Sequence, residues 1–500
     1  MVNQFDKQSE STETGPEQTS KEEQAAGAQD CHASQSISGD ASMVHECGSV
    51  SRLELGFLVL ASFFAAGLAL FYMQGEDALY WSDYNYYRYM TWFLKEQVLT
   101  NPLSTPLLVF VSTGLMYNFF FALPLLPFAI VFGDSRSVFI ASMAAVYLAP
   151  FAFMLGIIAR QTIKSELAAP RRLALYAGAG LALTIPTLWA PVLRGYPDHG
   201  SAMFVLLAMI LYIKNRARLS AKSIVLIGLC LGLAPLLRRH FFYLSFSFAA
   251  AMLIHQVYLA RISSLSPMQF VRGPLCRWCS VGVTSALLLL TVGFLFVNSM
   301  LTSDFLTLYK SAYVSAFEGF VYFYQAFGGL VLLFSVAGFF LAIKSKMLDK
   351  STAVLVFSFS LISFFVWPIF GRHVAIHYTI YAAPLVVLGN VFLLLYLGTR
   401  SSRMAKAAAC ALFLFQLANF SIGLMPESVV SRLPFTPARF GMLTVALAEP
   451  EPAGLSLILS ANYAPQVRHD FSEMERLFAY LLKEGGKGPV FVSTSNHILA

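Results

Sequence analysis

Acidic and aromatic residues directly follow the first long apolar run of the sequence. Residues 76–92 hold three carboxylates, and Asp83, Tyr87 and Arg88 stand there among many Tyr and Trp residues. Because Tyr and Trp prefer the membrane–water interface, an aromatic belt with solvated charges would explain this composition without any chemistry. The functional alternative is an acid at the membrane surface, where desolvation and the Tyr and Arg neighbours tune Asp83 as a general base.

A second acid stands in the short segment between Arg194 and Gly200, where Asp198 is followed by His199. A turn built on Pro197 and the glycines explains this segment without a function. The loop is short, so the flanking apolar runs must hold Asp198 and His199 close to the membrane. Together with Asp83 they could bind a divalent cation, but they form no clear metal-ligand set. The sequence therefore indicates no metal site and no cofactor beyond that candidate cation.

Two basic clusters interrupt the apolar runs further along the chain. The first cluster is Arg238, Arg239 and His240, and the second, with the aromatic residues beside it, is Arg372, His373, His377, Tyr378 and Tyr381. Two such clusters at one depth would form a clamp for a phosphate or pyrophosphate, which Arg binds through paired hydrogen bonds. Long basic side chains that reach toward lipid headgroups are the alternative explanation.

The composition is that of a membrane protein. Of the 500 residues, 57% are hydrophobic and 12% are charged, against about 25% charged residues in soluble domains. The net charge of +7 lies in short loops beside apolar runs, so it does not indicate a nucleic-acid partner. The runs are almost free of ionisable residues, which argues against an ion-coupled transporter. No Gly-rich nucleotide loop follows a strand pattern, which favours a lipid-linked over a nucleotide-linked substrate.

Positive charge alternates between the gaps that separate the apolar runs, and this alternation predicts the topology. Lys and Arg crowd five gaps, which should face the cytosol. These gaps are residues 160–172, 214–222, 261–277, 344–351 and 399–406. The alternation holds only if run 107–132, which contains Gly114, Pro124 and Pro127, is broken and does not change sides. An ordinary span beside a misassigned neighbour is the alternative.

We therefore predict an all-α polytopic membrane protein with about eleven transmembrane helices and outer juxtamembrane helices. The predicted spans are residues 55–73, 138–159, 173–192, 201–213, 223–237, 241–260, 278–300, 326–343, 352–370, 377–398 and 407–425. The amino terminus should be cytosolic and the carboxy terminus extracytoplasmic.

Three regions follow from this organisation. Residues 1–52 are polar and acidic and predict a disordered cytosolic tail. Residues 53–425 form the transmembrane catalytic domain, in which residues 74–137 are the first outer loop with its juxtamembrane helices. Residues 426–500 predict a small extracytoplasmic βαβ unit, with strands at 455–460 and 489–492 and a capping box that opens a helix over 472–483.

These features resemble the GT-C superfamily of membrane glycosyltransferases. The branch they resemble contains the bacterial lipid A aminoarabinose transferases, the protein O-mannosyltransferases and related rhizobial lipopolysaccharide sugar transferases. The resemblance covers roughly residues 53–425, and a Pro-rich amphipathic stretch at 101–127 also fits it. The matching motif positions are Asp83 with Tyr87, Asp198, Arg238 or Arg239, and the stretch with Arg372, His377, Tyr378, Tyr381 and Pro384.

The sequence departs from that branch at two points. The family commonly has an acidic pair in the first outer loop, but Tyr84 follows Asp83 here. The aminoarabinose enzymes have Glu-Lys-Pro where this chain has Ser104, Thr105 and Pro106. The missing carboxylate and lysine point to a different sugar or acceptor.

The resemblance implies inverting transfer of a sugar from a polyprenyl-phosphate donor to a cell-surface hydroxyl on the extracytoplasmic side of a bacterial inner membrane. Asp83 and Asp198 would be catalytic. The residues implied in binding the substrate and its lipid phosphate are Tyr87, Arg88, His199, Arg238, Arg239, Arg372, His373, His377, Tyr378 and Tyr381. The acceptor would be a glycan, a lipid or a protein. A polysaccharide polymerase or ligase and a lipid-linked sugar flippase remain as alternatives.

Overall fold

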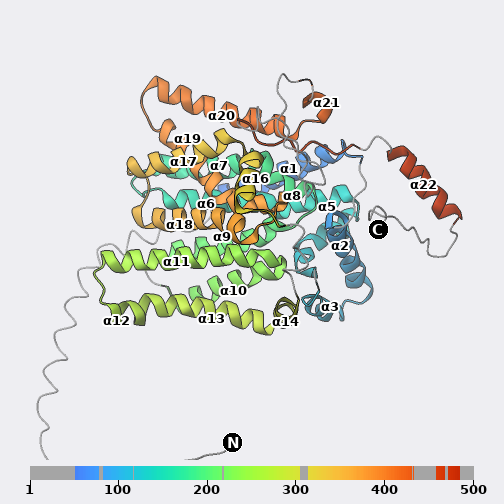
Figure 1. Cartoon of the computed structure of the whole chain (residues 1–500), viewed down its shortest axis with the longest axis horizontal. Coiled ribbons are helices and arrows are strands. Elements are labelled where there is room, and N and C mark those ends of the chain that lie inside the picture. The colour runs from blue at the N-terminus through green and yellow to red at the C-terminus, as the bar shows by residue number, and fades with distance from the viewer. Residues whose placement is uncertain are drawn as a thin grey trace, which may run out of the picture. The chain divides into compact units, whose positions relative to one another are not determined.

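The fold is described from a computed structural model of the chain. The structure describes residues 51–77, 83–115, 117–216, 219–303, 313–430, 432, 458–467 and 471–484. Within these residues the elements are helices and three isolated β-bridges, with no sheet (Figure 1). The prediction of an all-α polytopic protein is confirmed. The tail predicted over residues 1–52 lies outside the described residues as far as residue 50.

The helical elements follow one another closely along the chain. In the first half they are α1 (Arg52–Met73), α2 (Asp83–Thr100), α3 (Thr105–Ser112), η1 (Phe119–Leu125), α4 (Leu126–Phe132), α5 (Arg136–Met143), η2 (Ala144–Leu148), α6 (Ala149–Thr162), α7 (Ala168–Leu183), α8 (Pro186–Leu193), α9 (Asp198–Asn215) and α10 (Ala221–Leu237). In the second half they are η3 (Arg239–Phe241), α11 (Phe242–Ile262), α12 (Pro267–Phe270), η4 (Val271–Leu275), α13 (Cys276–Thr291), α14 (Phe294–Thr302), α16 (Ala316–Phe327), α17 (Gly329–Lys344), α18 (Lys350–Val366), η6 (Trp367–Gly371), η7 (Ile376–Ala382), α19 (Ala383–Gly398), α20 (Arg403–Leu424), α21 (Glu427–Val430) and α22 (Phe471–Glu484).

Seven helical stretches of the described chain are long and apolar enough to cross a membrane. Two bent pairs raise the number to nine: α7 with α8, bent by 58°, and α16 with α17, bent by 94°. The two remaining predicted runs lie in α9 and α10, which have 18 and 17 residues. All eleven predicted runs thus lie in helices, although length and composition alone support at most nine of them as spans.

The run over residues 107–132 is broken, as predicted. It forms α3, η1 and α4, which have 8, 7 and 7 residues, whereas a crossing needs about 20. Pro124 lies inside η1, and the Asn118 side chain accepts a hydrogen bond from the Phe120 amide to start that turn. Proline removes a backbone donor, which suits the 3-10 geometry of η1, whereas the break in the run lies between the end of α3 at Ser112 and the start of η1 at Phe119.

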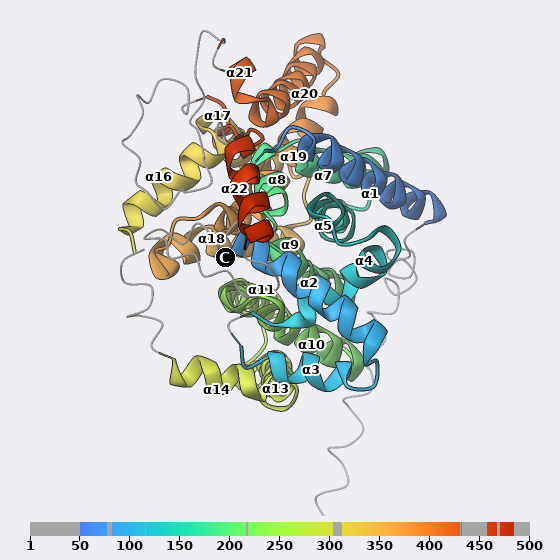
Figure 2. The same cartoon turned by 90° about the vertical axis from the view of Figure 1, so that its right-hand side faces the viewer.

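The predicted cytosolic gaps meet at one end of the helix bundle, here named the basic end. Arg160 pairs with Glu54, and Arg216 pairs with Asp349 at 3.0 Å. The loops predicted to lie outside meet at the opposite end, named the site end, where α2 and α3 lie. In Figure 1 the basic end is at the left, with α12, and the site end is at the right; Figure 2 looks onto the site end.

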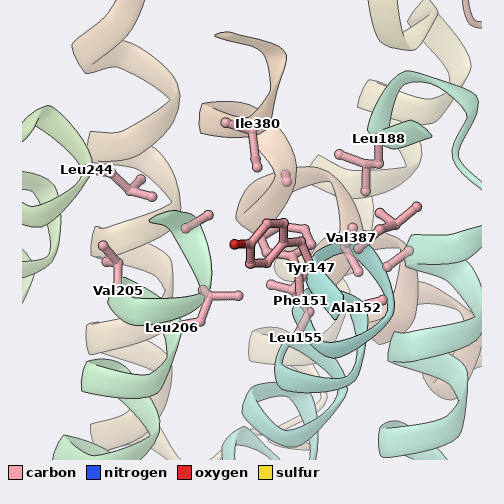
Figure 3. Packing of buried hydrophobic residues seen from close by; sticks show 14 of the residues in the cluster. Tyr147, Phe151, Ala152, Leu155, Leu188, Val205, Leu206, Leu244, Ile380 and Val387 are labelled. Carbon is pink, nitrogen blue, oxygen red and sulfur yellow. The ribbon is translucent and has the colours of Figure 1, made fainter. Parts of the chain in front are cut away.

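Buried aromatic and aliphatic side chains fill the space between α6, α9, α11 and α19. Figure 3 shows Tyr147 and Phe151 among Leu206, Leu244 and Val387. Small residues let other helices approach more closely: a Cβ on Gly338 of α17 would collide with the Gly389 carbonyl of α19. Such close backbone contacts are typical of membrane helix interfaces, where van der Waals packing replaces the hydrophobic effect.

A short stretch near the carboxy terminus, residues 458–467, is here named the closing segment. Tyr463 and Ala461 in it are buried, and the Tyr463 amide donates to the Gly423 carbonyl at 2.7 Å. The Asn419 amide donates to Ser460 at 2.9 Å, so the segment is held against the end of α20. The closing segment therefore packs into the site end of the bundle.

The predicted βαβ unit is only partly represented in the structure. Its helix is α22, and its second strand, 489–492, lies outside the described residues. Residues 458–460 of the first predicted strand are described and form no strand. The local apolar pattern predicted a strand here. In the structure, Ser460 is hydrogen-bonded to the helix bundle instead, and its hydroxyl donates to the Phe327 carbonyl at 2.7 Å.

Candidate functional site

The starts and ends of four helices place the candidate residues at the site end. Helix α2 begins at Asp83 and α9 begins at Asp198, whereas α10 ends just before Arg238. His377 lies in the 3-10 helix η7 that leads into α19. Residues at helix ends carry backbone groups without helical partners, and polar side chains gather there naturally.

Asp198 is the centre of the cluster. Its carboxylate is fully buried, with the Arg238 Nε at 3.3 Å from Oδ2 and the His240 Nε2 at 2.9 Å from Oδ1. Arg238 and His240 also keep most of their side-chain surface covered. A carboxylate in such a place needs the opposite charge and the hydrogen bonds beside it, because burial alone would disfavour its ionised form.

Arg238 is held on two further sides by tyrosines. Its guanidinium lies over the ring of Tyr87 at 5.0 Å and over the ring of Tyr196 at 5.4 Å. It also donates a hydrogen bond to the Tyr87 hydroxyl. The planar guanidinium of Arg can lie flat on an aromatic ring, whereas the Lys ammonium is a compact point charge, so the two tyrosines hold the guanidinium plane at this position.

The histidines form a stacked group next to this arginine. His377 stacks on Tyr196 with ring centroids 4.2 Å apart, and His240 lies 5.6 Å from His377. The Tyr381 hydroxyl donates to the His240 carbonyl at 2.5 Å, which fixes the short turn that carries His240. Tyr378 closes the group, 5.0 Å from His240.

Stacked aromatic rings pack against the histidines. Trp367 is buried and stacks on Tyr378 at 3.9 Å and on Tyr381 at 4.9 Å. Its indole N–H donates to the His373 carbonyl at 2.7 Å. Burial lowers the pKa of the His373 imidazole, because its protonated form is poorly solvated there.

Asp83 approaches the cluster from the first outer loop. The Tyr117 hydroxyl donates a hydrogen bond to Asp83 Oδ1, and the Asp83 charge acts on Asp198. Asp83 is only partly covered, whereas Asp198 is sealed. The site therefore offers one accessible carboxylate and one enclosed carboxylate that is paired with the Arg238 guanidinium and lies against the His240 imidazole.

The structure brings together seven of the residues singled out from the sequence. These are Asp83, Tyr87, Asp198, Arg238, His377, Tyr378 and Tyr381. His373 stands at the edge of the same group, 5.3 Å from Tyr378. Arg239 is half-buried beside Arg238, and its charge acts on His240.

Three other residues lie elsewhere. His199 is buried against Phe151, with ring centroids 5.0 Å apart, on the core side of α9. Arg88 turns away from the cluster and donates to the Asn85 side chain at 3.2 Å. Arg372 is exposed in a left-handed backbone conformation, with φ of 48°, and its Nε donates to the Ile369 carbonyl at 3.0 Å.

Some site residues were given no role from the sequence. His240 was predicted only as a member of the first basic cluster, with no separate role, and Tyr196 was not singled out. The position of His240 directly after two arginines at a helix boundary was the available signal. Nothing in the local sequence distinguishes Tyr117 or Trp367, since many aromatic residues surround both.

One group among the described residues could hold a metal ion. It consists of Asp198, His240 and His377, whose ligand atoms lie within 4.8 Å of one another. A carboxylate with two imidazoles suits a divalent ion such as Zn²⁺. The set differs from the one considered from the sequence, because His199 faces the core and Asp83 is bound by Tyr117.

Comparisons with known proteins gave structural matches but no sequence match. No family model and no curated protein matches the chain. Two crystal structures of ArnT from Cupriavidus metallidurans are similar to it, one bound to undecaprenyl phosphate and one in the apo state. Both have a TM-score of 0.48, with 13% and 14% sequence identity. Each match covers 76% of this chain, and the chain spans 66% of the length of those proteins.

Proposed function

We propose that this protein is a membrane glycosyltransferase of the GT-C kind that moves a sugar from a polyprenyl-phosphate donor to a hydroxyl acceptor. The observation that carries the proposal is the meeting of Asp83, Asp198, Arg238 and the histidines at one end of an apolar bundle. A carboxylate that can take a proton beside cations that can face a phosphate is the arrangement which this transfer needs.

The partly covered Asp83 takes the proton of the acceptor hydroxyl. The acceptor oxygen forms the new bond to the anomeric carbon of the sugar from the face opposite the phosphate. The bond between that carbon and the phosphate oxygen breaks, and its electron pair stays on the phosphate. The configuration at the anomeric carbon is therefore inverted, and polyprenyl phosphate leaves.

Arg238 stabilises the charge that develops on the departing phosphate, with Arg239 beside it as a further cation. Tyr87 and Tyr196 hold the guanidinium plane of Arg238, so little reorganisation is needed as the charge develops. Asp198 keeps Arg238 and His240 in place in the absence of an anion. A divalent ion bound by Asp198, His240 and His377 would add a positive charge next to the phosphate.

The basic end of the bundle faces the cytosol in this proposal, and the site end faces the extracytoplasmic side of a bacterial inner membrane. The carboxy-terminal residues then lie outside with the site end. The rule that Lys and Arg stay on the cytosolic side supports this orientation. Labelling of single cysteines introduced near Asp134 and near Lys346 with a membrane-impermeant reagent in whole cells tests it, because only the first should react.

The test of the activity uses the full chain in proteoliposomes with radiolabelled undecaprenyl-phosphate sugars. A detergent extract of cell envelope serves as the source of acceptors. We expect loss of label from the lipid and its appearance on an acceptor, and Asp83→Asn should abolish both. Asp134→Asn, the same change on an exposed carboxylate at the site end, is the matched control and should leave transfer unchanged.

The alternatives predict other outcomes of this experiment. A flippase would move the intact lipid-linked sugar between leaflets without breaking the bond to phosphate. A polymerase or ligase would consume lipid-diphosphate glycans and leave lipid-monophosphate sugars untouched. Either result would reject the transfer from a polyprenyl-phosphate donor.

A further inference from the structure

Tyr117 stands at the tip of the broken segment formed by α3, η1 and α4. The segment folds back because the Phe119 amide donates to the Ser112 hydroxyl at 3.0 Å. The tip then points into the site end, where the Tyr117 hydroxyl meets Asp83 Oδ1. This contact joins two segments 34 residues apart in the chain.

The Tyr117 ring is held between its neighbours on α2. It packs against Tyr86 with ring centroids 4.9 Å apart and against the edge of Tyr87 at 5.2 Å. Tyr87 is buried and also contacts Phe121, four residues beyond Tyr117, with ring centroids 5.0 Å apart. The phenol therefore has little freedom to swing away from Asp83.

The tip is also anchored to the loop that carries Arg238. Asn118, next to Tyr117, is buried and donates from its side-chain amide to the Leu236 carbonyl at the end of α10. Two neighbouring residues thus contact both parts of the site. Tyr117 binds the Asp83 carboxylate, and Asn118 binds the end of α10, just before Arg238. The broken segment fixes the distance between the two halves of the site.

We infer that Tyr117 is a positioning residue that orients the Asp83 carboxylate for the transfer reaction. This inference rests on the proposed function, in which Asp83 is the general base. By donating to Oδ1, the phenol directs the second oxygen, Oδ2, toward the acceptor hydroxyl. Hydrogen bonds to a charged group are short and directional, and a base must lie within hydrogen-bond reach of the proton it takes.

The experiment measures donor cleavage and transfer by the full chain with Tyr117→Phe, which removes only the hydroxyl. We expect kcat to fall about 10- to 100-fold, the range that follows from losing a hydrogen bond to a charged group. The KM for the undecaprenyl-phosphate sugar should stay unchanged, because the lost contact is made to the base and not to the donor. The thermal unfolding midpoint should also stay near that of the wild type, since Tyr86 and Tyr87 still pack the ring.

Two further variants make the result decisive. Tyr86→Phe removes a hydroxyl from the half-exposed neighbour in the same aromatic group and should keep full activity. Wild-type kcat in Tyr117→Phe, with Asp83→Asn inactive, would overturn the positioning role alone. Activity retained in Asp83→Asn would instead reject the proposed base, and a large rise in donor KM for Tyr117→Phe would place Tyr117 in donor binding.

Discussion

The Glu76→Gln substitution removes the negative charge from an ion pair that is sealed at the site end. The side chains of Arg194 and Glu76 are 2% and 0% exposed, and they contact each other directly. Arg194 also donates to the Ala464 carbonyl at 3.0 Å, and the Gln466 amide donates to Glu76 at 3.3 Å. The pair thus joins the end of α1, the loop before α9 and the closing segment.

The expected loss of stability is large because Arg194 would keep its charge without the carboxylate. Removing one partner of a buried pair typically costs about 3–5 kcal/mol. Gln keeps the shape of Glu and can still accept a hydrogen bond, so the lower part of that range, about 3 kcal/mol, is the expectation. For a chain of this size, with an unfolding entropy of about 2 cal/mol/K per residue, we expect a decrease of roughly 3 °C in the unfolding midpoint.

The assay is thermal unfolding of the detergent-solubilised protein at low and high salt. The difference between variant and wild type should persist at high salt, since buried charges are weakly screened. Glu54→Gln is the matched control, because its pair with Arg160 is more exposed, at 15% and 18%, and should lose less. A double variant with Arg194→Met and Glu76→Gln should recover most of the loss. A Glu76→Gln midpoint indistinguishable from that of the wild type, or no lower than that of Glu54→Gln, would refute the reasoning.

Three other changes follow from the same structure. Arg238→Lys keeps the charge but loses the stacking on Tyr87 and Tyr196, so we expect about tenfold less transfer with a raised donor KM, measured in proteoliposomes. Gly338→Ala should destabilise the protein by at least about 1–3 kcal/mol through overpacking of α17 against α19, seen as a lower thermal midpoint. Burial acts to raise the pKa of Asp349, but hydrogen bonds from Thr352 and the charge of Arg216 lower it below its ordinary value. Its contribution to stability is therefore present above a pH of about 4, the ordinary carboxyl pKa, and is lost as the pH falls through the lowered value. Asp349→Asn should accordingly lower the midpoint at pH 7 and flatten its decrease in acid.

The fold was largely predictable because charge and hydrophobicity are constrained along the whole chain. The alternation of basic gaps required run 107–132 to be broken, and the three short pieces α3, η1 and α4 agree with that requirement. The alternation also placed distant loops at a common end, and the contact of Asp198 with Arg238 is one result. These conclusions needed only the length of an apolar span and the side preference of Lys and Arg.

The composition of the site was less predictable because consecutive residues of a helix point about 100° apart. When Asp198 faces the site from the first turn of α9, His199 must face the core, where Phe151 packs against it. The same geometry separates Tyr87, which faces Arg238, from Arg88, which does not. The sequence shows that such neighbours stand together but not which of the two the bundle turns inward.

The closing segment has a consequence for how the protein is assembled in the membrane. Its contacts reach Tyr72 at the end of α1, whose hydroxyl donates to the Tyr463 carbonyl at 2.5 Å, and Gly423 at the end of α20. The ribosome makes these partners about 350 residues apart, since Tyr72 and Gly423 differ by that much in the chain. The segment can therefore dock only after α20 has left the insertion machinery. Its docking requires that α1 and α20 already lie next to each other in the bundle.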